Sequence, residues 1–310
     1  MNAAAPLEVA LLAVAVALGV GIYAVAVTDG LVARIVAGDA IRPGAAFLAP
    51  LRTAAWLITQ SRTSTERPDA AGWALAPALL AGLAVFALAM VPLGPGLVVA
   101  DPDTGFVAFS AAIAFVMIAV FLHGWSPNST FSLIGAYRYG AQALSFQIPF
   151  LLAMLATALP AESLSIVRIV EAQEPLWNVV RQPLGLPIYL VVGLAVSFWG
   201  PLNLPDGSDL AGGTSAEDAG IARLLWAVAR SSMLVAVAAM GAAGFLGGWY
   251  GPLLPGPVWM IVKTVVLLGA IVLAGHLFAR VRIQAFVLVS WVILIPLALL
   301  NIFVSGAFLL

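Results

Sequence analysis

The stretch TGFVAFSAAIAFVMIAVFLHG, residues 104–124, contains no Asp, Glu, Lys or Arg and is dominated by Ala, Phe, Val and Ile. An α-helix needs about 20 mainly apolar residues to cross ~30 Å of hydrocarbon, and this stretch meets that requirement. Seven more apolar runs lie at about residues 6–28, 72–98, 133–160, 185–201, 221–247, 257–279 and 283–306. The runs are continuous, whereas strands of a membrane barrel would be ~10-residue segments of alternating polarity. We therefore expect a single membrane domain, residues 1–310, of the all-α class with eight transmembrane helices.

The composition excludes a water-soluble globule. Hydrophobic residues make up 63% of the chain and charged residues 9%, whereas soluble domains have about 45–50% and about 25%. The net charge of −1 argues against a nucleic-acid partner, which would require a basic surface. The chain has no cysteine for a cluster or a thiolate nucleophile, and its two histidines are too far apart to favour a zinc site. We expect no metal site, no catalytic residue and no cofactor bound by this chain.

The placement of arginines predicts the orientation. The connection between the first two runs contains Arg34, Arg42, Arg52, Arg62 and Arg67. Arg280 and Arg282 lie between the last two runs, whereas the loops on the opposite side hold only Arg168 and Arg181. Because cytoplasmic loops carry the excess of Lys and Arg, both termini are predicted outside, and the first, third, fifth and seventh loops in the cytoplasm. The first run carries Glu8 and lacks a basic leading segment, which argues against a cleaved signal peptide.

Two of the cytoplasmic loops have a distinctive sequence. AAFLAPLRTAAWLITQ, residues 45–60, predicts a short amphipathic helix that lies either at the membrane interface or on the protein's own cytoplasmic surface. NLPDGSDLAGGTSAEDAG, residues 203–220, predicts an irregular segment that is either a solvated linker or a docking surface for another subunit. The acidic residues of this segment are Asp206, Asp209, Glu217 and Asp218.

Polar residues inside the runs are few. Burial of a polar group in hydrocarbon is costly, so we expect each of them to have a structural or functional role. Arg138, Gln142 and Ser145 form one stripe on the run at 133–160, followed by Gln147 and by Pro149, which should kink the helix. The stripe predicts either a pocket for water or a headgroup, or hydrogen bonds between helices.

Arg230 lies deep in its run and needs an acidic or carbonyl partner, either Glu8 or the acids of 203–220. Lys263 is expected to reach outwards to the membrane surface, with a role in proton relay as the alternative. His123 and His276 are expected at the membrane interface. Apart from Glu8, near an end, no run interior holds a clear acidic residue, so the chain is a poor candidate for a proton pump acting by itself.

Several segments, in collinear order over about residues 120–305, resemble the H subunit of bacterial NADH:quinone oxidoreductase (respiratory complex I) and the related membrane subunit of energy-converting hydrogenases. They are GWSPNSTFSLIGAYRYGAQALSFQIPF (124–150), IVEAQ (169–173), QPLGLPIYL (182–190), PLNLPDGSDLAGGTSAEDAG (201–220), FLGGWYGPLLPGPVWMIVKT (245–264) and IPLALLN (295–301). The resemblance implies eight spans with both termini outside, and a subunit that forms the membrane-side entrance to a quinone chamber. It also implies loops that meet a soluble redox arm, and no redox cofactor in the chain itself.

The chain departs from that family pattern at acidic positions of the proton path. The acidic positions hold Gln147, Val196, Asn203, Arg230 and Gln284. Next to two of them, Trp199 and Ala285 stand where the pattern has an arginine and a glutamine. Glutamine carries no proton, and an arginine reverses the sign of the local field. The resemblance therefore implies a divergent member in which the scaffold is kept and the acidic path is depleted.

The sequence thus predicts a structural and coupling subunit of a complex I-like NADH (or other donor):quinone oxidoreductase in a bacterial inner membrane, with no catalytic activity alone. Its expected partners are other membrane-arm and cluster-bearing subunits of a complex I-like or hydrogenase-like assembly, quinone as the assembly's substrate, and lipid. Arg34 and Arg42 would contact partners or the quinone route, Arg138 would orient the helix kink, and the four loop acids would dock the soluble arm. Gln142, Gln147, Arg230 and Lys263 are candidates for an intramembrane polar path. The alternatives are a stand-alone transporter or channel with a site near Gln147 and Arg230, and a membrane anchor without quinone contact.

Overall fold

The computed structural model describes residues 5–39, 43–61 and 63–307. Within these ranges the chain is helical, and the only β pairing is an isolated bridge between Gly94 and Leu97. Seven of the described helices are long and apolar enough to span a membrane. They are α1 (Leu7–Ala37), α3 (Ala70–Ala89), α4 (Gly105–Trp125), α5 (Thr130–Ala158), α9 (Gly220–Phe245), α10 (Gly256–Leu277) and the continuous run of α11 (Ile283–Val289), η5 (Ser290–Leu294) and α12 (Ile295–Ala307). The predicted all-α membrane class is confirmed.

The fifth predicted span, residues 185–201, is a shorter helix than expected. α8 (Gly185–Val196) has 12 residues, about 18 Å at the usual rise, so it does not cover the hydrocarbon core by itself. The chain turns after α8 because Phe198 and Gly200 have positive φ angles of 39° and 54°. A Cβ at Gly200 would lie 2.4 Å from the Cα of Gly275 on α10, so glycine also permits this close backbone contact. The count of eight spanning helices is not confirmed.

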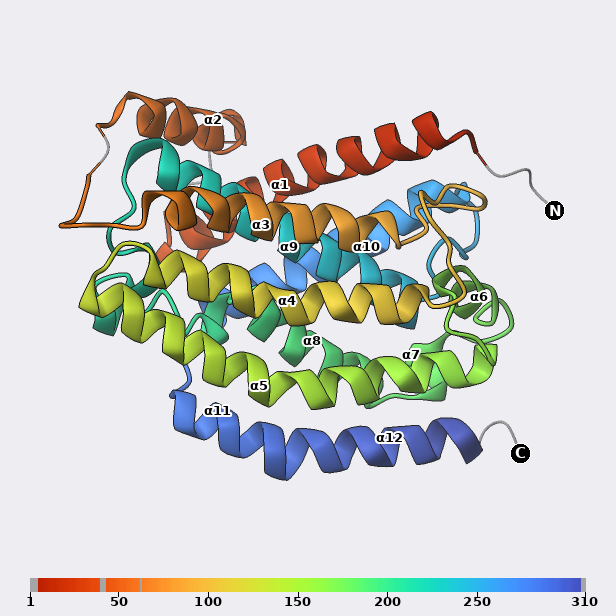
Figure 1. Ribbon diagram of the computed structural model, residues 1–310. Helices are drawn as coiled ribbons and strands as arrows, with labels where there is room; N and C mark the ends of the chain where they lie inside the picture. Colours follow the sequence, from red (N-terminus) through yellow and green to blue (C-terminus); the bar gives the residue numbers. More distant parts are fainter. Residues whose placement is uncertain (1–4, 40–42, 62, 308–310) are drawn as a thin grey trace.

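α1 begins and α12 ends at the same end of the bundle, which is on the right in Figure 1. This terminal end also carries η1 (Leu159–Ala161), α6 (Ile166–Glu171) and α7 (Asn178–Arg181). The opposite end, called the loop end below, carries α2 (Pro43–Thr59), the connections 126–129 and 278–282, and the segment 197–219. That segment contains the short helices η2 (Gly200–Leu202), η3 (Ser208–Leu210) and η4 (Gly213–Ser215).

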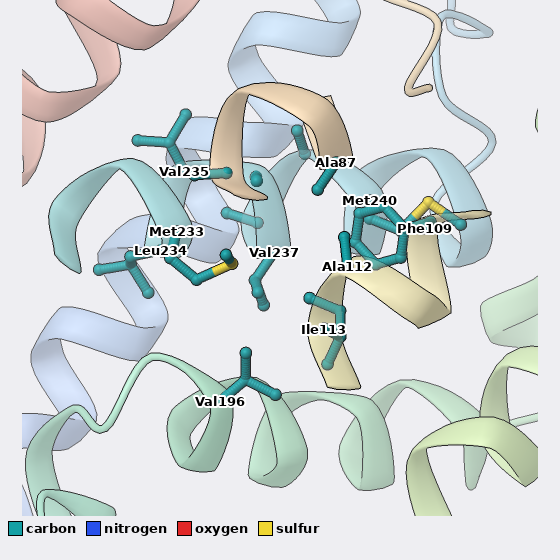
Figure 2. Packing of buried hydrophobic residues seen from close by; sticks show 14 of the residues in the cluster. Ala87, Phe109, Ala112, Ile113, Val196, Met233, Leu234, Val235, Val237 and Met240 are labelled. Atoms are coloured by element: carbon teal, nitrogen blue, oxygen red, sulfur yellow. The ribbon is translucent and has the colours of Figure 1, made fainter. Parts of the chain in front are cut away.

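α9 is the central helix, and its small residues let neighbouring helices approach closely. From Ala236 to Gly244 every residue is buried, and most are Ala or Gly. A Cβ at Gly241 would lie only 2.9 Å from the Tyr189 ring on α8. Figure 2 shows the packing of α9 against α3, α4 and α8 through Ala87, Phe109, Ile113, Val196, Met233, Val237 and Met240. α1 and α12 are the least buried of the long helices and expose large apolar side chains, as helices that face lipid do.

Candidate functional site at the loop end of the bundle

The segment 203–219 folds back onto the loop end. The backbone N–H of Thr214 donates to the carbonyl oxygen of Pro205 at 3.1 Å. Gly213 has a φ of 55°, and a Cβ there would lie 1.7 Å from the same oxygen, so this turn requires glycine. A Cβ at Gly135 on α5 would lie 2.5 Å from that oxygen. The turn is therefore in close contact with α5, and the carboxylates of the segment are brought to the helices.

Asp209 lies between two arginines, one on α5 and one in the connection between α10 and α11. Its Oδ2 atom lies 2.7 Å from Nη1 of Arg138, and its Oδ1 atom lies 3.3 Å from Nη1 of Arg280. The hydrogen bond from Arg138 lowers the pKa of Asp209 below its ordinary value. The Asp209 side chain is 54% exposed, so the cluster is accessible at the surface. Arg138, which was expected to orient a kink in α5, forms this ion pair with the loop segment.

Asp206 lies in the same segment but is nearly buried, with a side chain 10% exposed. Its Oδ1 atom accepts hydrogen bonds from the hydroxyls of Thr214 and Ser215, and its Oδ2 atom lies 3.6 Å from Nη1 of Arg230. The partner of Arg230 is therefore one of the acids of 203–220 and not Glu8. Glu8 is exposed in the first turn of α1, at the terminal end.

The Arg230 guanidinium also binds backbone carbonyls at the C-terminal end of α8. Its Nε donates to the carbonyl of Ser197 at 3.3 Å, and an Nη donates to the carbonyl of Phe198. The guanidinium carbon lies 4.8 Å from the centre of the Phe198 ring and 4.5 Å from that of Trp199. Carbonyls at a helix C-terminus lack helical partners and attract cations, so Arg230 stabilises the turn that ends α8.

His123 and Asp218 form a buried pair next to this turn. His123 Nε2 lies 2.9 Å from Asp218 Oδ2, and the two side chains are 1% and 0% exposed. Trp73 donates its indole N–H to Asp218 Oδ1 at 3.0 Å, and the His123 ring stacks on Trp226 with 3.6 Å between ring centres. α3, α9 and the 203–219 segment cover His123 in the last turn of α4, and its expected depth at the membrane interface stays a prediction. Sequence reasoning missed this pair, since 95 residues separate its members.

Glu217 links its own segment, 203–219, to the connections that contain Ser129 and Thr63. Its Oε1 atom accepts a hydrogen bond from Ser129 Oγ at 2.8 Å, and its carbonyl accepts one from Thr63 Oγ1 at 2.9 Å. Two pockets flank this point. One, of about 360 Å³, is lined by Arg67, Asp69, Trp125, Ser126, Asn128 and Ser129 among others. The other, of about 270 Å³, is lined by Thr63, Trp73, Ala74, Pro77, Glu217 and Leu225 among others.

α2 is the helix predicted at 45–60, and it exposes apolar side chains. Ala46 and Leu57 are buried. Phe47, Leu48, Leu51, Trp56 and Ile58 are each about half exposed or more. Arg34 is half-buried in the last turn of α1, and Arg42 lies outside the described residues. α2 packs against α1, whose last turn also exposes apolar side chains at Ile35 and Val36.

The polar residues of α5 differ in their side-chain hydrogen bonds. The Gln142 side-chain amide donates to the carbonyls of Ala195 and Leu202 at 2.8 and 2.9 Å, so for Gln142 the interhelical hydrogen-bond alternative is correct. Ser145 donates to the carbonyl of Ala141, within its own helix. Gln147 is half-buried and makes no side-chain hydrogen bond within the described part of the chain. Pro149 lies within a helix that is continuous from Thr130 to Ala158.

Lys263 is far from these groups, at the terminal end. Its ammonium donates to the carbonyls of Gly248 and Tyr250 and lies 4.1 Å from the Trp177 ring centre and 5.7 Å from that of Trp259. The residue is 5% exposed. Its side chain therefore points towards the connection 246–255 and is enclosed by protein. The loop-end groups and Lys263 do not form one continuous path among the contacts of the described residues.

The fold and these polar groups define a multi-pass helical membrane protein whose connections interlock at one end. The chain belongs to the NADH dehydrogenase family, whose model matches residues 10–306. It is 32% identical over 274 residues to the second H subunit of NADH-quinone oxidoreductase from Syntrophobacter fumaroxidans, covering 85% of this chain and 83% of the relative. It is 33% identical over 249 residues to the first H subunit of the same enzyme from Rhodopseudomonas palustris, covering 79% and 78%. The resemblance to H subunits predicted from the sequence is confirmed.

Proposed function

We propose that the protein is a non-redox membrane subunit of a complex I-like assembly that passes electrons from NADH, or another donor, to a quinone. Its relatives are named as H subunits of NADH-quinone oxidoreductases, and they match it over most of their length. The partners would be other membrane-arm subunits and cluster-bearing subunits of a complex I-like or hydrogenase-like assembly. The location would be a bacterial inner membrane, with the basic loop end in the cytoplasm and both termini outside.

The observation that carries this proposal is the interlocked loop end. Four connections meet there, and the Arg138–Asp209–Arg280 cluster is ordered yet open to the surface. Exposed ion pairs contribute little to the stability of a single chain, but a fixed charged surface favours docking of a partner with complementary charge. We propose this surface as the contact for the cluster-bearing arm. The exposed apolar face of α2 would lie in lipid beside the quinone entrance.

We further propose that the proton path usual in this family is depleted here. Gln147 replaces an ionisable residue of the family pattern and makes no side-chain hydrogen bond within the described residues. Arg230 places a guanidinium where the pattern has an acid, and Asp206 and the carbonyls of Ser197 and Phe198 hold it there. A guanidinium does not release its proton in proteins, so Arg230 cannot relay one as a carboxylate would. Together these features support a coupling and chamber-forming role rather than proton translocation by this subunit alone.

Purification of the tagged chain in mild detergent tests the proposal. We expect cluster-bearing subunits and donor:quinone reductase activity to co-purify with the chain. A photoreactive quinone analogue should label α2 and residues 203–219. The paired variant Asp206→Ala and Asp209→Ala should lose the cluster-bearing arm, while Asp103→Ala, an exposed acid at the terminal end, should retain it. A monodisperse lone chain that moves a solute across reconstituted vesicles would overturn the proposal in favour of a transporter.

A further inference from the structure

A polar pocket and an apolar pocket meet at Trp125, at the loop end of α4. The polar one is the pocket of about 360 Å³ described above, which Trp125 lines together with Arg67, Asp69 and Ser129 among others. The apolar one, of about 340 Å³, is lined by Met117, Ile118, Phe121, Leu122 and Trp125. Both volumes are in the range of ligand sites. Because the two pockets share a tryptophan, they are neighbours, and one amphipathic molecule fits both.

The apolar pocket has the position and the length of a groove for an acyl chain. It follows one face of the spanning helix α4 from Met117 to Trp125, a rise of about 12 Å. One leaflet contributes about 15 Å of hydrocarbon. The Phe121 ring stacks on Trp125 with 6.0 Å between ring centres and meets Tyr137 of the neighbouring α5 edge-on at 5.4 Å (Figure 1). The groove therefore has a preformed aromatic wall.

The polar pocket is formed where two connections of the loop end are tied together. The backbone N–H of Asp69 donates to the carbonyl of Ser126 at 2.8 Å. The side-chain amide of Asn128 donates to the carbonyl of Glu66 at 3.1 Å. These bonds join the connection before α3 to the connection between α4 and α5. They fix the backbone on both sides of Arg67, so the pocket is a built feature of the fold.

The two charged residues of the polar pocket have opposite signs. Arg67 takes part in none of the ion pairs among the described residues, and a guanidinium presents several donors to a phosphate. Asp69 caps α3, because its Oδ1 atom accepts the N–H of Gly72 at 3.1 Å. A carboxylate accepts several hydrogen bonds, so Asp69 can also accept from an ammonium group. The pocket is therefore complementary to a headgroup that carries both a phosphate and a primary amine.

We propose that this face of α4 binds one phospholipid molecule with such a headgroup, a phosphatidylethanolamine. The phosphate lies at Arg67, the amine lies at Asp69, and one acyl chain follows the groove from Trp125 to Met117. Tryptophan is enriched where headgroups meet hydrocarbon, which agrees with its place between the two pockets. The proposal requires only that the chain lies in a bilayer, and it does not rest on the proposed function. The bound lipid would hold the two connections against the membrane surface.

Photocrosslinking tests the site. The tagged chain, with any subunits that accompany it, is placed in phosphatidylcholine nanodiscs that contain a small fraction of phosphatidylethanolamine with a photoreactive acyl chain. We expect mass spectrometry to find the label on residues 117–125. Unlabelled phosphatidylethanolamine should remove this label, whereas neither inorganic phosphate nor more phosphatidylcholine, whose quaternary amine has no N–H, should do so. Equal competition by phosphatidylcholine would mean annular lipid only and would overturn the proposal. A partner subunit crosslinked to this face in place of lipid would also overturn it.

Variants of the polar pocket test the headgroup contacts. Arg67→Ala should lower the labelling of residues 117–125 about fivefold. The matched control is Arg168→Ala, an exposed arginine on α6 at the terminal end, which should label like the wild type. Asp69→Asn should remove the preference for phosphatidylethanolamine and keep α3 folded, since asparagine is an equally good helix cap. Unchanged labelling in Arg67→Ala would exclude the headgroup site.

A variant of the groove tests the position of the acyl chain. Ile118 is 49% exposed, so Ile118→Trp should fill the groove without disturbing the core and should abolish most of the labelling. Val107→Trp is the control, because Val107 is 48% exposed on the same helix and does not line the groove. Equal labelling of the two tryptophan variants would show that the chain does not lie along residues 117–125.

Discussion

Nη1 of Arg138 lies 2.7 Å from Oδ2 of Asp209, so a helix residue of α5 directly holds the exposed part of the 203–219 segment. Arg280 contacts the other carboxylate oxygen, which ties the connection before α11 to the same point. Both partners of the first pair are partly exposed, so the contact contributes less than about 1 kcal/mol to stability. Its main effect is to fix the position of the segment.

This contact predicts that the local stability of the 203–219 segment depends on pH. Because the pKa of Asp209 is lowered in the folded chain, its contribution is present above the unfolded pKa and is lost as the pH falls through the folded pKa. Hydrogen exchange of amides 207–212, corrected for intrinsic rates, should therefore lose protection between about pH 5 and about pH 2. Asp209→Asn should show low protection throughout that range. Equal protection of the wild type at both limits would contradict the prediction.

Gln142 should stabilise the bundle more than Gln147 does. Gln142→Leu removes hydrogen bonds to the carbonyls of Ala195 and Leu202 and leaves both buried acceptors without that donor. We expect a loss of roughly 1–2 kcal/mol, measured as a lower midpoint of thermal unfolding in detergent. Gln147→Leu is the matched control on the same helix, and it should leave the midpoint nearly unchanged. A larger loss for the control would reverse our assignment of the stabilising residue.

Lys263 is the only lysine of the chain, which makes its burial easy to measure. An amine-reactive reagent should leave Lys263 unmodified in nanodiscs and modify it fully after denaturation in detergent, because the ammonium is enclosed by two carbonyls and two tryptophans. Mass spectrometry of the peptide that contains residue 263 gives the modified fraction. Rapid modification in nanodiscs would mean that the side chain reaches the headgroups instead.

Gly213 should be intolerant of a side chain. In Gly213→Ala the new Cβ would meet the carbonyl of Pro205, and the backbone has a positive φ, so the turn must open. We expect faster proteolysis of the 203–219 segment and weaker retention of partner subunits. Gly140→Ala is the control, because nothing lies within 4 Å of its added Cβ. If both variants behave like the wild type, the turn does not depend on Gly213.

The long helices could be predicted from the sequence because each depends on a local property. In lipid, a backbone must satisfy its own hydrogen bonds, so a continuous apolar run of sufficient length becomes a helix wherever it lies. The family resemblance also came from local segments, such as residues 124–150 and 201–220. The short α8 shows the limit of this reasoning, because Ser197 and Phe198 belong to an apolar run and yet their carbonyls bond to Arg230.

The sequence by itself determined the membrane class, the long helices, the family and the need of Arg230 for a partner. Only the tertiary structure decided that Asp206 is this partner, that Asp209 remains exposed, and that Asp218 is buried against His123. These three acids lie within 13 residues of one another in a segment that reads as uniformly polar. Their environments differ because the turn at Gly213 and the packing of distant helices determine which carboxylates face inwards, and no local pattern contains that information.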